Sequence, residues 1–343
     1  MEQQHRRAEH RIAIVGVGAS LPDAIRTNDD PIFDWLKAHQ QPGQDLFQGY
    51  RQRRVLAPGQ DLIDLMVPAA QKALDGARLH VQDVDVLIGQ GSVGEYLTPN
   101  VLALVHQRLG LPASAWIVPV ADEFTNFNTS LVLAHALIRA GQVRNALVVC
   151  GCNWTRYVDY HTPQSISASD GAGAAVIART DDPSLFALVD AETFAQTQDY
   201  GCMYMASDVL SESALDAPPG FSSPYFHITA AGRTAFVEFG EKPPIAVVNR
   251  LLARHRLSGE DVALISHQAS SVLLETWGQG IHPGQYVQTL ETFANVTLAT
   301  IPITLATCYQ QIEMDYLVLL GIGVALNTSA LLLERHRRWA SSG

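Results

Sequence analysis

The sequence predicts an α/β fold in which strands alternate with crossover helices, and three observations lead to it. Several short runs are rich in Val and Ile without alternating polar residues, as in strands that are covered on both faces. Segments with the apolar spacing of helices lie between these runs. Hydrophobic residues make up 47% and charged residues 17% of the 343 residues, which is the balance of a folded globular chain and not of a disordered one.

The predicted strands and helices follow one another along the chain. The apolar runs expected to form buried strands are residues 12–17, 84–88, 115–120, 146–152, 172–178 and 262–266. The segments with helical spacing are residues 62–77, 100–109, 126–140 and 244–255. Because helices separate successive strands, the strands are expected to be parallel.

The length predicts two compact units or one duplicated unit. A helix, a buried strand and a short polar motif follow one another at residues 62–92, and the same order recurs at 244–270. We therefore expect two related halves, residues 1–180 and 181–343, divided where Asp and Pro break the pattern at 180–183. No low-complexity linker separates the halves, so we expect them to share one core.

Composition and cysteine usage exclude several partners. The chain has 23 Lys and Arg against 34 Asp and Glu, a net charge of −11, and an acidic surface repels nucleic acid. Four cysteines are too few for a disulfide framework and lack zinc-site spacing, so we expect no metal site and a reducing compartment. Residues 1–11 lack an apolar secretory segment, and glycines and polar residues interrupt the apolar stretch 316–333. These features predict a cytoplasmic protein without nucleic-acid or membrane partners.

Some motifs are better explained by structure than by chemistry. Gly16 and Gly18 follow a predicted strand, but the third glycine of a dinucleotide fingerprint is missing, so a tight turn is expected. In the small residues 169–175, Asp170 is expected to tie down a turn by accepting backbone N–H bonds.

Two polar residues at the ends of predicted elements are candidate functional residues. His267 directly follows the strand at 262–266, and ligands bind at the carboxyl ends of strands in open α/β sheets. Its imidazole can donate a hydrogen bond to a carbonyl oxygen or move a proton. Asn295 follows Phe293 at a candidate turn, and its amide can donate to the same oxygen.

Several segments, taken in order, carry a resemblance to a known family. They are the opening strand with Gly16, Gly18 and Leu21-Pro22, followed by Thr27-Asn28-Asp29; the segment Arg51 to Val55; Ser169-Asp170-Gly171-Ala172-Gly173-Ala174; Ser266-His267-Gln268-Ala269; the turn at Asn295; Ile301-Pro302; and a glycine-containing hairpin at residues 321–333. Together they resemble the thiolase superfamily, and most closely the chain-initiating ketoacyl-ACP synthases (ketoacyl synthase III), over nearly the whole chain. The resemblance implies a thiolase-like, duplicated five-layered αβαβα fold, normally found as a homodimer.

The resemblance also implies a chemistry. Enzymes of this family transfer acyl groups and catalyse Claisen condensation on CoA or carrier-protein thioesters, so CoA or phosphopantetheine is the substrate carrier and no tightly bound cofactor is expected. In the family, a cysteine at the start of the buried central helix of the first half becomes acylated. A histidine and an asparagine then bind the malonyl thioester carbonyl and stabilise the enolate, and His267 and Asn295 match that pair.

The nucleophile departs from the family pattern. Phe124 stands where the resemblance places the cysteine, and a slip of one residue would put Glu123 or Thr125 there instead. Phenylalanine cannot carry an acyl group, so a conventional two-stage condensation is not expected. Val324 and Ala325 stand where the family carries more glycine beside its oxyanion hole, which implies reduced access for an acyl group.

Glu123 leaves two alternatives open. A carboxylate in the first turn of a helix is favoured by the dipole and stays ionised, so Glu123 could act as a general base or as a nucleophile that forms an anhydride. Asp122 and Glu123 could equally cap the helix, and residue preferences slightly favour this alternative.

Arg51, Arg53 and Arg54 form a group of cations in an otherwise acidic chain. The resemblance places this segment near the mouth of the pantetheine tunnel, where the three side chains could bind the phosphates of CoA or an acidic carrier protein. A solvated basic loop is the alternative.

Two functional hypotheses follow. The first is an acyltransferase that promotes decarboxylation or direct acyl transfer without a cysteine-bound intermediate, in specialised polyketide or fatty-acyl metabolism. The second is a catalytically silent companion subunit of a heteromeric condensing enzyme. The expected assembly is accordingly a homodimer, or a heterodimer with a homologous ketosynthase.

Overall fold

The structure is a computed structural model that describes residues 11–40, 43, 45–96, 98–206 and 225–336. Its strands are β1 (Arg11–Ser20), β2 (Ile25–Thr27), β3 (Gln52–Arg54), β4 (Val86–Gly91), β5 (Trp116–Pro119), β6 (Asn145–Asn153), β7 (Asp170–Thr180), β8 (Ala187–Ala195), β9 (Met203–Ala206), β10 (Tyr225–Ile228), β11 (Val262–Ser266), β12 (Gln285–Val287), β13 (Tyr316–Gly323) and β14 (Asn327–Glu334). Its α-helices are α1 (Asp34–Ala38), α2 (Ile63–Ala77), α3 (Val101–Leu109), α4 (Asn126–Arg139), α5 (Ala230–Glu241), α6 (Pro243–Arg254), α7 (Ser271–Ile281), α8 (Leu290–Phe293) and α9 (Thr300–Cys308).

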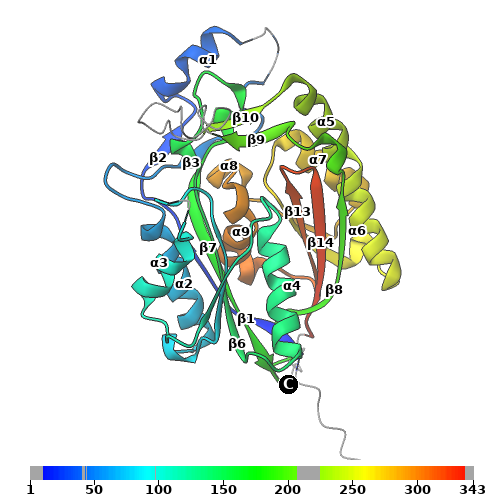
Figure 1. Cartoon of the computed structure of the whole chain (residues 1–343). Helices are drawn as coiled ribbons and strands as arrows, with labels where there is room; N and C mark the ends of the chain where they lie inside the picture. The colour runs from blue at the N-terminus through cyan, green and yellow to red at the C-terminus, as the bar shows by residue number, and fades with distance from the viewer. Residues whose placement is uncertain (1–10, 41–42, 44, 97, 207–224, 337–343) are drawn as a thin grey trace, which may run out of the picture.

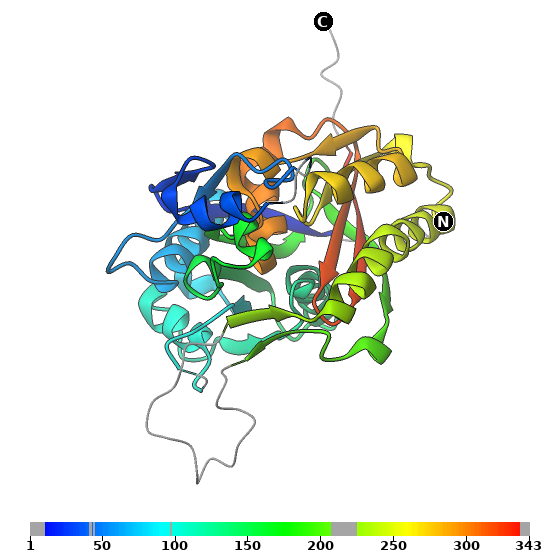
Figure 2. The same ribbon diagram turned by 90° about the horizontal axis from the view of Figure 1, so that it is seen from above.

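The elements stack in five layers, as Figure 1 shows. Helices α2 and α3 cover the outer side of the strands around β1, β7, β6 and β4, and α4 and α9 lie in the middle of the molecule. Helices α5, α6 and α7 cover the outer side of the strands around β8, β14, β13 and β11. Seen from above, the cyan helices of the first half and the yellow helices of the second lie on opposite sides (Figure 2). The predicted αβαβα arrangement is therefore confirmed.

The strand order repeats between the two halves of the sheet. The whole order is β12-β11-β13-β14-β8-β1-β7-β6-β4-β5, so β5-β4-β6-β7-β1 on one side has the same relative order as β12-β11-β13-β14-β8 on the other. The two sets meet through a single residue pair between β1 and β8. This repeat supports a duplicated chain, and the division at residues 180 and 181 stays a prediction.

The sheet is mixed, which corrects the expectation of parallel strands. Strand β4 pairs in parallel with β5 and β6, and β11 pairs in parallel with β12 and β13. By contrast, β7 runs antiparallel to β1 and β6, and β14 runs antiparallel to β13 and β8. Crossover helices return the chain to a parallel strand, whereas a short turn leads directly from β13 into β14 and reverses it.

All six predicted strands and all four predicted helices are present, with ends that differ by a few residues. Helix α9 was anticipated only as a short motif. Most of its side chains are buried, so it has no polar face and no amphipathic period. Apolar side chains fill the space around α4 and α9 and beneath α6 and α7, and a second cluster lies beneath α2 and α3.

Gly16 and Gly18 lie inside strand β1, so the predicted tight turn is wrong. A Cβ atom at Gly16 would stand 2.1 Å from the backbone oxygen of Ala73, and one at Gly18 would stand 2.2 Å from that of Ala69. These glycines therefore allow β1 to pack directly on the backbone of α2.

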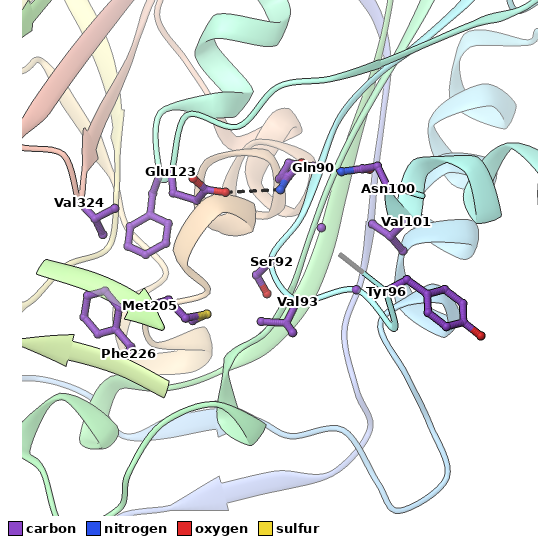
Figure 3. Close-up of a pocket in the computed structure, with 13 residues that line it drawn as sticks. Gln90, Ser92, Val93, Tyr96, Asn100, Val101, Glu123, Met205, Phe226 and Val324 are labelled. Carbon is purple, nitrogen blue, oxygen red and sulfur yellow. Dashed lines mark hydrogen bonds between the residues drawn. The ribbon is translucent and has the colours of Figure 1, made fainter. Parts of the chain in front are cut away.

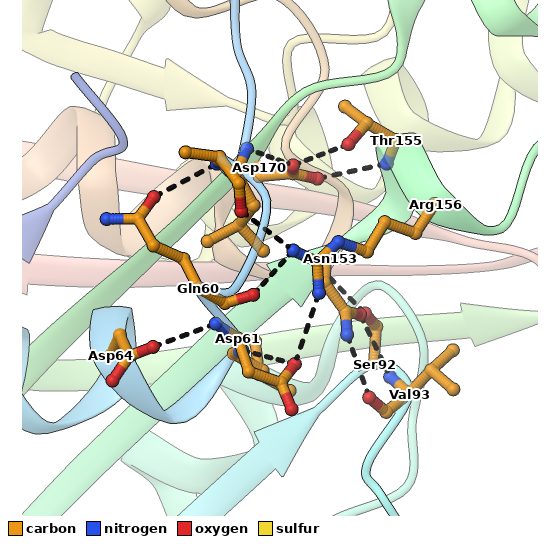
Figure 4. A network of polar contacts seen from close by, with 12 residues as sticks. Gln60, Asp61, Asp64, Ser92, Val93, Asn153, Thr155, Arg156 and Asp170 are labelled. Carbon is orange, nitrogen blue, oxygen red and sulfur yellow. Dashed lines mark hydrogen bonds and ion pairs between the residues drawn. The ribbon is translucent and has the colours of Figure 1, made fainter. Parts of the chain in front are cut away.

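The Asp170 carboxylate joins separate segments of the first half in a network of hydrogen bonds (Figure 4). Asp170 begins strand β7 instead of lying in a turn, and its side chain is fully buried. The carboxylate accepts hydrogen bonds from the backbone N–H of Leu56 and of Thr155, each at 2.9 Å, and from the Thr155 hydroxyl at 2.5 Å. The expected bonds from backbone N–H groups are thus present, within a strand. Burial raises the pKa of Asp170 above its ordinary value.

In the described part of the chain, no helix has the length and apolar character needed to cross a membrane. In the same residues, no group of three or more His, Cys, Asp or Glu side chains is placed to hold a metal ion.

Candidate active site

His267 lies directly after the end of β11, as its sequence position predicted. Its backbone N–H donates to the Leu320 oxygen of the neighbouring strand at 2.8 Å. The side chain of Gln268 donates to the Ser266 oxygen at 2.9 Å and accepts from the Thr289 N–H at 3.0 Å, which fixes the loop. His267 is 3% exposed, and burial lowers its pKa to about 4. The imidazole is therefore neutral near pH 7 and can donate one N–H bond.

Asn295 follows helix α8, and a hydrogen bond to its side-chain oxygen fixes the orientation of its amide. Its backbone N–H donates to the Ser167 oxygen at 3.0 Å, and its side-chain oxygen accepts from the Thr297 N–H at 2.8 Å. Among the described residues, no group accepts a hydrogen bond from the Asn295 amide nitrogen. Two amide N–H donors are thus left for a ligand.

His267 and Asn295 line one cavity of about 230 Å³, which we call the His267 cavity. Most of its other described side chains are apolar. These are Phe124, Trp154, Pro163, Ile166, Met203, Phe226, Ile228, Phe236, Ala269, Ile322 and Val324. The structure therefore brings two hydrogen-bond donors together in mainly apolar surroundings, where such donors act more strongly than in water.

Phe124 packs directly against His267. The two rings are parallel within 2°, with centroids 5.6 Å apart. Phe124 stands just before α4, which begins at Asn126. The neighbouring Thr125 is 1% exposed and its hydroxyl accepts from the Asn327 amide at 2.9 Å, so it does not line the cavity.

The two cysteines of β6 are buried thiols. Cys150 accepts a hydrogen bond from the Asn126 amide at 3.4 Å, and Cys152 accepts one from the Thr297 hydroxyl at 3.0 Å. Burial raises the pKa of each thiol to about 12, which suppresses the thiolate that attacks a thioester. Neither lines the His267 cavity.

Glu123 lies in a second cavity, of about 410 Å³, which we call the Gln90 cavity. Phe124, Phe226 and Val324 line both cavities, whereas Glu123 lines only the Gln90 cavity. His267 and Asn295 line only the His267 cavity, so the structure places Glu123 and this pair in different cavities.

Of the two alternatives for Glu123, the helix cap is wrong. Helix α4 begins three residues after Glu123, and neither Asp122 nor Glu123 accepts a hydrogen bond from its backbone. Asp122 instead accepts from the side chains of Thr129 at 2.6 Å and Asn327 at 2.7 Å. Because Glu123 is largely enclosed, burial raises its pKa, which opposes the ionised state that the dipole argument assumed.

The three arginines do not form one cation cluster. Arg53 is fully buried, its Nε donates to the Ile166 oxygen at 2.6 Å, and its guanidinium lies over the rings of Phe33, Phe47 and Tyr50. This burial corrects its assignment as a phosphate-binding residue.

Arg51 and Arg54 lie in different surroundings from Arg53. The side chain of Arg51 is 73% exposed and pairs with Glu291 at 3.3 Å. Arg54 donates to the Pro22 oxygen at 3.3 Å and lies over the ring of Phe293. Of the three, Arg51 is the one with a largely solvent-exposed cation.

Several residues that line the two cavities were not predicted from the sequence. Gln90 near the end of β4 and Trp154 just after β6 lie at the carboxyl ends of their strands, as His267 does. The position rule that singled out His267 would have found both. Phe226 on β10 comes from a segment that had no distinctive pattern.

Comparisons with known proteins point to one family. The family model for 3-oxoacyl-[acyl-carrier-protein (ACP)] synthase III matches residues 121–196, and the model for its C-terminal part matches residues 252–335. The beta-ketoacyl-[acyl-carrier-protein] synthase III of Clostridium perfringens (strain 13) is 26% identical over 292 residues, which cover 82% of this chain and 87% of that protein. The corresponding protein of Alkalilimnicola ehrlichii is 26% identical over 340 residues, 94% of this chain and 98% of its own.

Solved structures give the same result. The 3-oxoacyl-(acyl carrier protein) synthase III of Pseudomonas aeruginosa has a TM-score of 0.78 at 25% identity and covers 96% of this chain and 99% of its own. The priming β-ketosynthase of the R1128 polyketide pathway has a TM-score of 0.81 at 20% identity and covers 96% of this chain and 98% of its own. At this identity the match supports the fold alone. The chain belongs to the ketoacyl synthase III family of the thiolase superfamily.

Proposed function

We propose that the protein acts on acyl thioesters of CoA or an acyl carrier protein and decarboxylates a malonyl-type thioester without forming an acyl-cysteine. The observation that carries this proposal is the pairing of His267 and Asn295 in one cavity, with Phe124 packed on the imidazole. The relatives named as acyl-carrier-protein synthases support thioesters as the substrate class. Direct transfer of the acyl group to an acceptor is the alternative use of the same site.

The chemistry follows from the two donors. Neutral His267 and the Asn295 amide would both donate to the thioester oxygen. When the bond between the carboxylate and the α-carbon breaks, its electron pair moves onto that oxygen, carbon dioxide leaves, and a solvent proton on the α-carbon then gives the acetyl thioester. Because the oxygen is more negative in the enolate than in the thioester, both donors bind the transition state more strongly than the substrate.

The setting we propose is specialised polyketide or fatty-acyl biosynthesis. In the family, chain initiation of ordinary fatty-acid synthesis needs an acylated cysteine, and Phe124 offers no such atom. The fold similarity to a priming ketosynthase of a polyketide pathway is consistent with this setting.

A time course with malonyl-CoA tests the proposal. Acetyl-CoA formation is followed by liquid chromatography for the unaltered protein and for His267→Ala and Asn295→Ala. Losing one such donor costs on the order of 100- to 1000-fold in rate elsewhere, and we expect a loss of that order in each variant. Identical time courses for all three proteins would contradict the proposal.

A companion subunit is the second candidate, and the edge of the sheet favours it. Strand β5 ends the strand order, and on it Trp116 is 48% and Ile117 is 40% exposed. An edge strand with exposed apolar side chains is a template for pairing with another chain.

The assembly can be tested by light scattering. We expect a dimer of this chain, or a heterodimer when a cysteine-bearing homologue is co-expressed, and we expect Ile117→Lys to weaken either one. An unaltered protein that decarboxylates malonyl-CoA as a monomer would exclude a role that depends on a partner.

A further inference from the structure

We propose that the Gln90 cavity receives the acyl part of the substrate and selects acyl groups that carry a hydrogen-bond donor, such as a hydroxyl or an ammonium group. Glu123 and Gln90 are the specificity-determining residues in this proposal. It rests on the proposed function, because it assigns the substrate class of the same site.

The two cavities adjoin at Phe124. Phe124, Phe226 and Val324 line both, so a thioester held by His267 and Asn295 can extend its acyl chain past these apolar side chains. The Gln90 cavity, at about 410 Å³, lies within the size range of small-molecule sites. It is therefore large enough for a short acyl chain.

One wall of the Gln90 cavity is polar. Gln90 lies between Glu123 and Asn100, as Figure 3 shows. The Asn100 amide donates to the Gln90 oxygen at 3.3 Å, and the Gln90 amide donates to Glu123 Oε1 at 3.4 Å. The Asn100 oxygen is occupied as well, since it accepts from the Leu102 N–H at the start of α3.

This arrangement leaves acceptor capacity on Glu123. Within the described residues, only the Gln90 amide and the Glu123 backbone N–H donate to this carboxyl, and a carboxylate offers about four acceptor sites, so it can still accept a hydrogen bond from a ligand. A ligand that carries a donor would extend the hydrogen-bonded series of Asn100, Gln90 and Glu123. An alkyl chain would instead cover these acceptor sites without pairing them, and such a loss weakens binding by roughly 10- to 100-fold.

The rest of the Gln90 cavity limits what the substituent can be. Its other lining side chains are mostly apolar (Val93, Val101, Phe124, Met205, Phe226 and Val324), with Ser92 and Tyr96 the polar exceptions among the described residues. This lining fits an aliphatic chain with one polar tip better than a group that is polar throughout. A polar tip that reaches the Glu123 carboxyl meets both conditions.

Binding of matched acyl-CoA thioesters tests the inference. Calorimetric titration of the full chain compares three thioesters of equal chain length that end in a methyl, a hydroxyl or an ammonium group. We expect the hydroxyl or the ammonium thioester to bind about tenfold or more tightly than the methyl thioester. Equal affinities for all three would overturn the inference.

Two variants of Glu123 identify the group responsible. A bound ammonium group would favour the ionised carboxylate despite its burial, and Glu123→Gln cannot ionise, so this variant should abolish a preference for the ammonium thioester and retain one for the hydroxyl thioester. Glu123→Leu should abolish both and strengthen binding of the methyl thioester, which also shows that the variant is folded. A preference that survives in Glu123→Leu would overturn the inference.

The control variant is Glu313→Gln, because the Glu313 side chain is exposed in a loop outside both cavities. It should keep the affinities of the unaltered protein. Decarboxylation of malonyl-CoA with no preference among the three thioesters would refute only this inference. No turnover of malonyl-CoA and no binding of any acyl-CoA would refute the proposed function as well.

Discussion

Burial of His267 predicts a loss of stability in acid. The side chain is 3% exposed, and burial lowers its pKa from the ordinary 6.5 to about 4. The unfolded chain therefore binds a proton on this ring near pH 6.5, whereas the folded chain binds it only near pH 4. Because the unfolded state holds more protons between these values, unfolding becomes easier as the pH falls through this window.

The size of the effect follows from the two pKa values. The difference between 6.5 and about 4 corresponds to roughly 3 kcal/mol over the whole window, and about 2 kcal/mol of it is lost between pH 7 and pH 5. The free energy of unfolding is measured in urea at both pH values for the unaltered protein and for His267→Asn. We expect the unaltered protein to lose about 2 kcal/mol more than the variant. The comparison cancels other titrating groups, including His135, whose pKa burial also lowers.

Two results would refute this reasoning. One is an equal pH dependence of the two proteins. The other would come from an NMR titration of the His267 ring, whose signals are identified because they are absent from the spectrum of His267→Asn. A titration midpoint near pH 6.5 in the folded protein would mean that solvent reaches the imidazole and that burial does not keep it neutral.

Three further substitutions test other parts of the structure. Phe124→Cys should become acylated by an acyl-CoA, because its thiol would stand beside the imidazole, and an unmodified residue in intact-mass and peptide mapping would contradict this. Gly173→Val should lower the free energy of unfolding in urea by about 1 to 3 kcal/mol, because a Cβ there would lie 2.7 Å from the Ile303 nitrogen. Arg53→Met should destabilise the protein by about 1 to 3 kcal/mol in the same assay, because it leaves the Ile166 oxygen and Asn28 Oδ1 without their donor, while Arg51→Met should change it little, because the Arg51 side chain is exposed.

The sequence allowed the buried strands and the position of His267 to be predicted for a physical reason, whereas the five layers followed from the family resemblance. Strands covered on both faces are apolar throughout, so runs such as residues 146–152 stand out without further information. His267 was found because the end of such a run marks the edge of a parallel sheet where ligands bind. Helix α9 has no such signal, since a helix buried on most sides lacks amphipathic spacing.

The errors at Glu123 and Arg53 have local causes. The predicted helix begins at residue 126, as α4 does, and its cap is Thr125, so Glu123 lies too far ahead of the helix to cap it; its carboxyl lies in the Gln90 cavity instead. Neighbouring residues of a strand point to opposite faces, so Arg53 on β3 points inward while Arg54 does not. Arginines close together in the sequence therefore do not form one cation cluster when they lie on a strand, and residues 52–54 had not been predicted as a strand.

The composition of the His267 cavity favours decarboxylation over direct acyl transfer. Transfer to an acceptor requires a base that removes the proton of the attacking group. Among the described residues that line this cavity, none is Asp or Glu, and an imidazole with a pKa of about 4 is a weak base. Decarboxylation needs no such base, because the electron pair of the breaking bond moves onto an oxygen that two donors already hold. Phe124 contributes to this preference, since a phenyl ring stacked on the imidazole excludes water and favours the neutral, donating form.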